Sequence, residues 1–188
     1  MTTVIYLTGA ILALSALFLM AWIVARVYLR FRGTMLVTCP ETSEPAAVEV
    51  DARHAAFTAP LGEPGLRLKS CSRWPESQGC SQECLNLIES GPKECLVRTI
   101  LTKWYEGKSC IFCGKALGEI NWLEQPVMMS PDRVTFEWKE IPAERVPEVI
   151  ETHMPVCWNC HVAETFRRVH PELVLSRPSK RGGSHQKN

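Results

Sequence analysis

The first 25 residues of the chain are almost continuously apolar, and this pattern ends abruptly at Arg26. No charged side chain occurs before that position. About 20 apolar residues in a helix are enough to cross the roughly 30 Å hydrocarbon core of a bilayer. The apolar run lacks the preceding basic stretch that is typical of a cleaved signal peptide. The pattern therefore predicts a transmembrane helix with a basic flank over residues 1–32.

The charges that flank this run predict its orientation. Arg26, Arg30 and Arg32 follow the apolar residues, and no basic residue precedes them. Positively charged flanks of a membrane helix remain on the cytoplasmic side. We therefore expect a single-pass membrane protein whose N-terminus is outside and whose residues 33–188 are cytoplasmic.

Beyond the span, short runs that alternate apolar and polar residues predict an α+β domain. Residues 35–39 and 46–50 flank a turn-rich segment that contains Pro40 and Pro45, which favours two antiparallel strands. Residues 66–69 alternate apolar and basic side chains and predict a third strand. A further antiparallel hairpin is expected from residues 127–129 and 134–138, on either side of a Ser-Pro-Asp turn.

Helical spacing of apolar residues predicts several helices around these strands. Ser81 is the expected N-cap of the first helix, and Pro92 can begin the second, which Gly107 ends. A third helix is expected to be interrupted near Pro147. The expected helices cover residues 81–89, 92–106, 142–153 and 157–170.

The charge balance and the cysteine content narrow the possible functions. The net charge is only +1, so a general affinity for nucleic acid is not expected, and the chain contains nine cysteines. In a reducing cytoplasm, metal ligation is the default role of so many thiols. The sequence has no phosphate-binding loop, no H-E-x-x-H and no G-x-S-x-G. We therefore expect neither an enzyme nor a small-molecule substrate.

Four cysteines form two C-x-x-C pairs, Cys110 with Cys113 and Cys157 with Cys160. Each pair supplies two thiolates at a bend, and a folding-sized insert brings the halves together around one tetrahedral ion. Gly114 follows the first pair and permits the tight turn that aims backbone N–H groups at the sulfurs. The spacing predicts one metal site, and zinc is the preferred ion.

The order of knuckle, hairpin and ligand-bearing helix resembles the treble-clef zinc finger, or more loosely a zinc ribbon, over residues 108–170. The resemblance rests on the four paired cysteines and Gly114. It implies a structural zinc ion that is closed to substrate. The double pair is also similar to the knuckles of rubredoxins, which hold iron, although His161 stands where rubredoxins usually carry glycine.

The second pair, together with His161, is also a complete C-x-x-C-H motif, which attaches c-type haem. In that case Cys157 and Cys160 would form the thioether links, and His161 would be the axial ligand. This alternative leaves the Cys110 pair without a purpose, and haem attachment takes place outside the cytoplasm. Zinc therefore remains preferred, and His161 is interpreted as a residue beside the site or on an exposed helix face.

Four further cysteines, Cys39, Cys71, Cys80 and Cys84, form a possible second metal site. On a helix, Cys80 and Cys84 would share one face because they are four residues apart. The group could bind a second zinc ion or an iron–sulfur cluster, or its members could be small buried hydrophobic residues. Cys95 is interpreted as a core residue.

The expected function follows from this organisation. We expect a membrane-anchored, structural zinc-binding protein that serves as an accessory or assembly subunit of a larger integral membrane complex. Its partners would be integral membrane subunits and the lipid bilayer. The alternative is an electron-transfer protein that carries iron, a cluster or haem. The expected units are residues 1–32, a Cys-rich subdomain 33–105, the double-pair subdomain 106–175 and a disordered basic tail 176–188.

Overall fold

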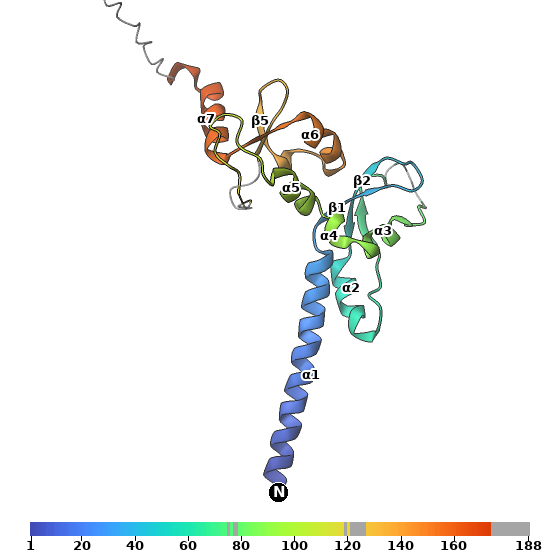
Figure 1. Ribbon diagram of the computed structural model, residues 1–188. Coiled ribbons are helices and arrows are strands. Elements are labelled where there is room, and N and C mark those ends of the chain that lie inside the picture. Colours follow the sequence, from blue (N-terminus) through green and yellow to red (C-terminus); the bar gives the residue numbers. More distant parts are fainter. Residues whose placement is uncertain (75, 77–78, 119, 121–126, 174–188) are drawn as a thin grey trace, which may run out of the picture.

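The computed structural model describes residues 1–173 except 75, 77–78, 119 and 121–126. A long N-terminal helix projects from a body in which two small sheets are surrounded by short helices (Figure 1). This is the α+β architecture with short antiparallel sheets that the sequence predicts. The predicted basic tail, residues 176–188, lies outside the described residues.

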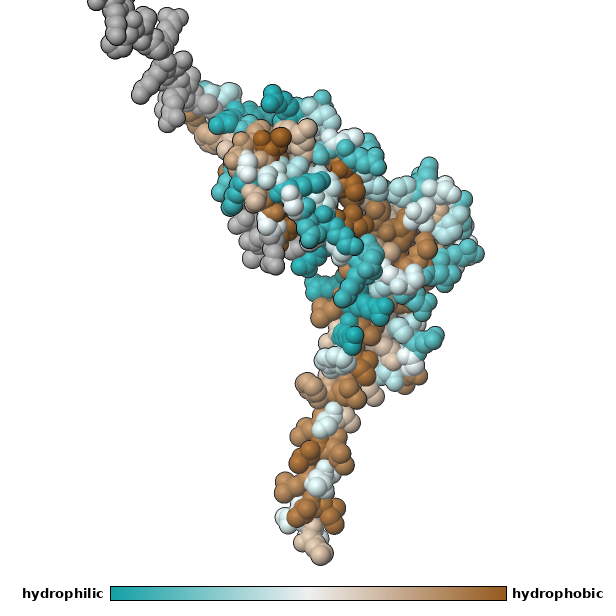
Figure 2. All heavy atoms as spheres, viewed as in Figure 1, coloured by the Kyte–Doolittle hydropathy of each residue, from teal (hydrophilic) through white to brown (hydrophobic). Residues whose placement is uncertain are grey.

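The projecting helix is α1 (Thr2–Phe31), and its 30 residues make it about 45 Å long. Its side chains are exposed along the first two thirds of its length, and only its last third packs against the body. Figure 2 shows hydrophobic residues along most of α1, whereas the body has a mixed surface. The helix is thus long and apolar enough to span a membrane, as predicted.

The first sheet is antiparallel and has the strand order β1-β2-β3. Met35 pairs with Val48, which in turn pairs with Cys71, and alternate residues of the first two strands are buried. The third strand begins two residues later than the alternation of residues 66–69 predicts. The strands are β1 (Thr34–Thr38), β2 (Pro45–Val50) and β3 (Leu68–Cys71).

Between the second and third strands, the chain returns along α1 as helix α2 (Ala52–Thr58) and the 3-10 turn η1 (Ala59–Leu61). Both elements pack against α1 (Figure 1). Asp51 caps α2 by accepting a 3.0 Å hydrogen bond from the His54 N–H. This helix was not predicted. Its buried alanines, with the end of α1, one face of the first sheet and α3, form the first hydrophobic core.

Three helices follow the first sheet, at positions that differ in detail from those predicted. The first begins at Cys84 rather than at Ser81, because Gln82 adopts a positive φ of 58°, and its N-cap is Glu83. The predicted second helix is broken at Leu96, whose extended backbone forms an isolated bridge with Met35. The helices are α3 (Cys84–Ser90), α4 (Pro92–Cys95) and α5 (Val97–Tyr105).

The second sheet is antiparallel with the order β5-β4-β6. The predicted hairpin forms its first two strands, and the third strand was not predicted. Met128 pairs with Phe136 on one side and with Pro155 on the other. The strands are β4 (Val127–Met129), β5 (Thr135–Glu137) and β6 (Met154–Val156).

Of the remaining helices, α6 and α7 pack against this sheet, whereas η3 contacts β1 and β2 of the first sheet. The predicted helix over residues 142–153 is divided near Pro147 into a 3-10 turn and an α-helix. Pro147 lies in the first turn of the α-helix, where a missing N–H costs no hydrogen bond. The Trp104 indole N–H donates a 2.8 Å hydrogen bond to the Ile150 carbonyl, which joins α5 to α6 in a second core. The elements are η2 (Trp138–Glu140), η3 (Ala143–Arg145), α6 (Val146–Thr152), α7 (Trp158–Val169) and η4 (Pro171–Leu173).

Candidate metal centre

The first cysteine pair lies in a tight turn that hydrogen bonds hold closed. The Cys110 N–H donates to the Lys115 carbonyl at 2.9 Å, and the Gly114 N–H donates to the Cys110 carbonyl at 2.9 Å. Gly114 has φ +70°, a conformation that favours glycine because it has no Cβ. The sequence prediction of a knuckle that depends on Gly114 therefore matches the backbone.

The second pair lies where β6 gives way to α7. Cys157 is the N-cap residue of α7, and Cys160 lies in its first turn. The Ile111 N–H donates a 3.1 Å hydrogen bond to the Pro155 carbonyl, which holds the knuckle beside β6. This backbone hydrogen bond joins two residues that are 44 positions apart in the sequence, and it brings the two cysteine pairs together.

The four sulfur atoms of this cluster all lie within 4.8 Å of one another. The sulfurs of Cys113 and Cys157 are 3.7 Å apart. A tetrahedral thiolate site with metal–sulfur bonds of 2.3 Å has sulfur–sulfur edges of about 3.8 Å. A disulfide would need about 2.05 Å. The spacing therefore suits a cluster that could hold a metal ion, as the double C-x-x-C pattern predicts.

The electrostatics of the cluster favour a bound cation. Burial opposes ionisation of Cys110, but N–H donors from Cys157, Cys113 and Phe112 outweigh it and lower the Cys110 pKa to about 6. Burial, followed by the three neighbouring sulfurs, raises the pKa of Cys160. Four crowded sulfurs oppose one another's ionisation, and a divalent cation removes that opposition. The cluster thus has N–H donors that stabilise one thiolate, and it needs a nearby positive charge before all four sulfurs can ionise.

His161 follows the second pair directly and lies on α7. Its Nδ1 is 2.9 Å from the Thr135 hydroxyl oxygen, and its ring lies 5.5 Å from that of Trp158. Burial lowers the His161 pKa, which favours the neutral ring. The histidine therefore joins α7 to β5. The sequence does not predict this contact, because no motif around Thr135 indicates a partner on α7.

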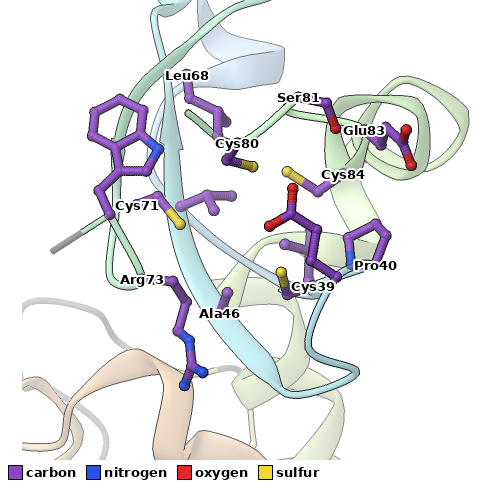
Figure 3. A pocket seen from close by; sticks show the side chains of 14 residues that line it. Cys39, Pro40, Ala46, Leu68, Cys71, Arg73, Cys80, Ser81, Glu83 and Cys84 are labelled. Atoms are coloured by element: carbon purple, nitrogen blue, oxygen red, sulfur yellow. The ribbon is translucent and has the colours of Figure 1, made fainter. Parts of the chain in front are cut away.

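The other predicted cysteines, Cys39, Cys71, Cys80 and Cys84, line one cavity beside the first sheet (Figure 3). Cys80 lies in the loop before α3, so the prediction that Cys80 and Cys84 share a helix face is wrong. Burial, followed by Cys80, Cys71 and Cys39, raises the Cys84 pKa to about 11. Among the described residues, the sulfurs of this second group are not as closely gathered as those of the double pair.

Cys95 lies at the end of α4, outside both groups, and packs against the first core, in line with its interpretation as a core residue.

Comparison with known proteins identifies no relative of this chain. No protein-family model matches the sequence, and neither a curated protein nor a solved structure matches it significantly.

Proposed function

We propose that this protein is a membrane-anchored accessory or assembly subunit whose domain is held together by structural zinc at Cys110, Cys113, Cys157 and Cys160. The observation that carries the proposal is the convergence of these four sulfurs within 4.8 Å. A closed set of four protein ligands leaves no open position for substrate, and such sites contribute folding free energy. The cluster therefore acts as a structural staple for the second half of the chain.

The element order around the cluster supports a treble-clef-like zinc site. A knuckle at Cys110 comes first, the β4–β5 hairpin follows, and Cys160 lies in the first turn of the closing helix. The haem alternative would require Cys157 and Cys160 to bind a porphyrin while they lie against the first pair. Their closeness to Cys110 and Cys113 favours instead a single metal ion bound by all four sulfurs.

A rubredoxin-like iron is the second candidate, because four thiolates bind zinc or iron with the same geometry. Cys113 is exposed at the surface, where an electron could enter such a site. The hydrogen bond of His161 to Thr135 gives the residue after the second pair a packing role that glycine could not fill. Zinc remains the first choice on that account.

The membrane part of the proposal depends on α1 and on the elements that pack beside it. α2 and η1 lie against the last third of α1, where Ile23, Val24, Val27 and Tyr28 are partly covered. On this same part of the body, Phe57 is 72% exposed and Leu61 is 89% exposed. Large apolar side chains beside a spanning helix fit the interfacial zone of a bilayer. The domain would then lie directly on the membrane face.

The basic end of α1 supports the predicted orientation, with the N-terminus outside and the domain in the cytoplasm. The Arg26 guanidinium lies 5.0 Å from the Trp22 ring, and Arg32 lies 5.9 Å from the Tyr28 ring. Aromatic and basic residues at this level are typical of the headgroup region on the cytoplasmic side.

A partner helix in the membrane would find a small-residue surface on α1. Gly9 and Ala13 are one turn apart, and a Cβ added at Gly9 would meet nothing within 4 Å. Such pairs let two helices approach closely in lipid. This surface supports integral membrane subunits as the partners.

Metal analysis of the full chain, purified in mild detergent, tests the zinc proposal. We expect zinc without visible absorption, whereas iron–thiolate, cluster and haem centres all absorb visible light. A positive haem stain on a denaturing gel would overturn the assignment of Cys157 and Cys160.

A reporter fused after Asn188 tests the orientation, and we expect it to be active only on the cytoplasmic side. Identification of proteins that co-purify in the same detergent tests the subunit role, and recovery of the chain without any integral membrane protein would contradict it.

A further inference from the structure

We infer that Cys39, Cys71, Cys80 and Cys84 form a second metal site, independent of the double pair, which binds one zinc ion between the first sheet and α3. This goes beyond the proposed staple, because it places a separate ion in the other core. The four residues come from four different places in the fold. Cys39 follows β1, Cys71 ends β3, Cys80 lies in a loop and Cys84 begins α3.

The four side chains converge although their positions in the sequence follow no metal-binding pattern. Figure 3 shows the sulfurs of Cys80 and Cys84 beside each other, and those of Cys71 and Cys39 at two other places around the same cavity. Cys71 lies in β3 and Cys84 in α3, while Cys39 and Cys80 lie in the loops after β1 and before α3. An ion bound here would join the sheet to α3 across the first core.

The Cys80 sulfur already accepts a hydrogen bond of the kind that supports a metal-bound thiolate. The Gln82 N–H donates to the Cys80 sulfur at 3.3 Å, and the positive φ of Gln82 sets the turn that aims it. Such donors orient a ligand and stabilise its negative charge. A cysteine that served only as a small apolar residue would not need them.

The turn that carries Cys39 is also closed by its own backbone. The Cys39 N–H donates to the Glu44 carbonyl at 2.8 Å, and the Ser43 N–H donates to the Cys39 carbonyl at 2.8 Å. Ser43 has φ +58°, which is uncommon for a residue with a Cβ. The turn therefore has the closed form of a knuckle, built on Ser43 in place of the glycine of the double pair.

The cavity has the size and the lining of a site for one ion. Its volume is about 20 Å³, which is room for a single water-sized sphere, and apolar residues such as Val37, Val48 and Leu68 form much of the wall. A water molecule would find few hydrogen-bonding partners there. A soft thiolate set suits zinc, which needs no other ligand.

These sulfurs stand farther apart than those of the double pair, so ion binding must draw them inward. Rotation of the cysteine side chains would have to shorten the distances between the sulfurs. The zinc–sulfur bond of 2.3 Å sets the end point. The ion would then replace loosely packed thiols with a rigid cross-link, which adds folding free energy to a small core.

Metal stoichiometry of cysteine variants tests this inference on the full chain in detergent. We expect two zinc ions per chain in the unchanged protein and one in Cys84→Ser. Cys95→Ser is the matched control, because Cys95 lies in the same half of the chain but outside the cavity, and it should keep both ions. Cys110→Ser should keep the ion of the second site and lose the other.

The outcomes separate this inference from the proposed staple. One ion per chain that Cys84→Ser retains and Cys110→Ser loses would overturn the second site and support the first. The reverse result would overturn the first and support the second. Titration of metal-free protein with Co²⁺ provides a readout that does not require a stable variant, since thiolate–cobalt absorption should rise until two equivalents are bound. Disulfides between these cysteines in protein isolated with blocked thiols would also overturn the inference.

Discussion

The Tyr105 hydroxyl donates a 2.6 Å hydrogen bond to the carbonyl of Val127, and both residues are buried. Tyr105 is the last residue of α5, and Val127 begins β4, the central strand of the second sheet. Val127 also pairs with Val156, the residue before Cys157. The bond therefore connects the helix that precedes the first cysteine pair to the sheet that positions the second.

Removal of this hydroxyl should weaken the second half of the chain. Tyr105→Phe leaves the buried Val127 carbonyl without its side-chain donor, which should lower the free energy of unfolding by about 1–3 kcal/mol. Denaturant unfolding of the metal-loaded protein measures the change. Tyr6→Phe is the control, because Tyr6 lies on the exposed part of α1, and its midpoint should not move. Equal midpoints for both variants would contradict the role assigned to the bond.

The same tyrosine predicts an alkaline sensitivity. Burial raises the pKa of Tyr105, so its neutral form stabilises the fold. That stability is fully present below the unfolded-state value of about 10 and is lost as the pH rises above it. We expect the melting temperature of the unchanged protein to fall more steeply above about pH 10 than that of Tyr105→Phe. Parallel curves for the two proteins would show that Tyr105 does not titrate in this way.

The sequence predicts the first sheet and the hairpin well because alternation of apolar residues determines which face of a strand is buried. It does not predict β6, since Pro155 lacks an N–H and argues against a strand, yet β6 lies at the sheet edge, where proline is tolerated. It also misses α2, whose stability comes from packing against α1 rather than from a strong helical pattern. Tertiary contacts, rather than the local sequence pattern, therefore determine that β6 and α2 form.

The double pair is predictable because each C-x-x-C encodes a local bend and requires a second pair. The group around Cys84 has no such local pattern. The sequence suggests that Cys80 and Cys84 share a helix face, but the left-handed Gln82 delays the start of that helix to Cys84 and leaves Cys80 in a loop. Cys80 and Cys84 approach Cys39 and Cys71 only because of the strand order of the first sheet, and the spacing of cysteines in the sequence does not reveal that order.

Loss of one ligand from the double pair should unfold one half of the chain and spare the other. Cys157→Ser removes a thiolate from the proposed metal site and with it the folding free energy that metal binding would supply. We expect loss of that ion and loss of amide protection in α5, β4 and α7, with protection retained in β1 and β2. Hydrogen exchange with mass spectrometry measures both regions. Cys95→Ser should leave both protected, and native protection of α7 in Cys157→Ser would contradict the structural role.

Gly114 tests whether the knuckle depends on its left-handed backbone. A Cβ added there would meet nothing within 4 Å, so the effect of Gly114→Ala comes from the φ of +70° alone. We expect a loss of about 1 kcal/mol and weaker metal retention against a chelator. Gly114→Asn should be milder, because asparagine tolerates this conformation better. Gly118→Ala, also in open space but without a positive φ, is the control and should behave like the unchanged protein.

The exposed side chains beside α1 predict direct contact with lipid. Phe57 and Leu61 lie on α2 and η1, which pack along the last third of α1. A benzoylphenylalanine photo-cross-linker at position 57 or 61 of the protein in vesicles should form adducts with phospholipid, because apolar residues at this level face the interfacial zone. Position 87, an exposed leucine on α3, is the matched control and should give none. Cross-links from 57 and 61 to another protein instead would show that α2 contacts a partner subunit, and lipid adducts at all three positions would show that the labelling is not specific to the face beside α1.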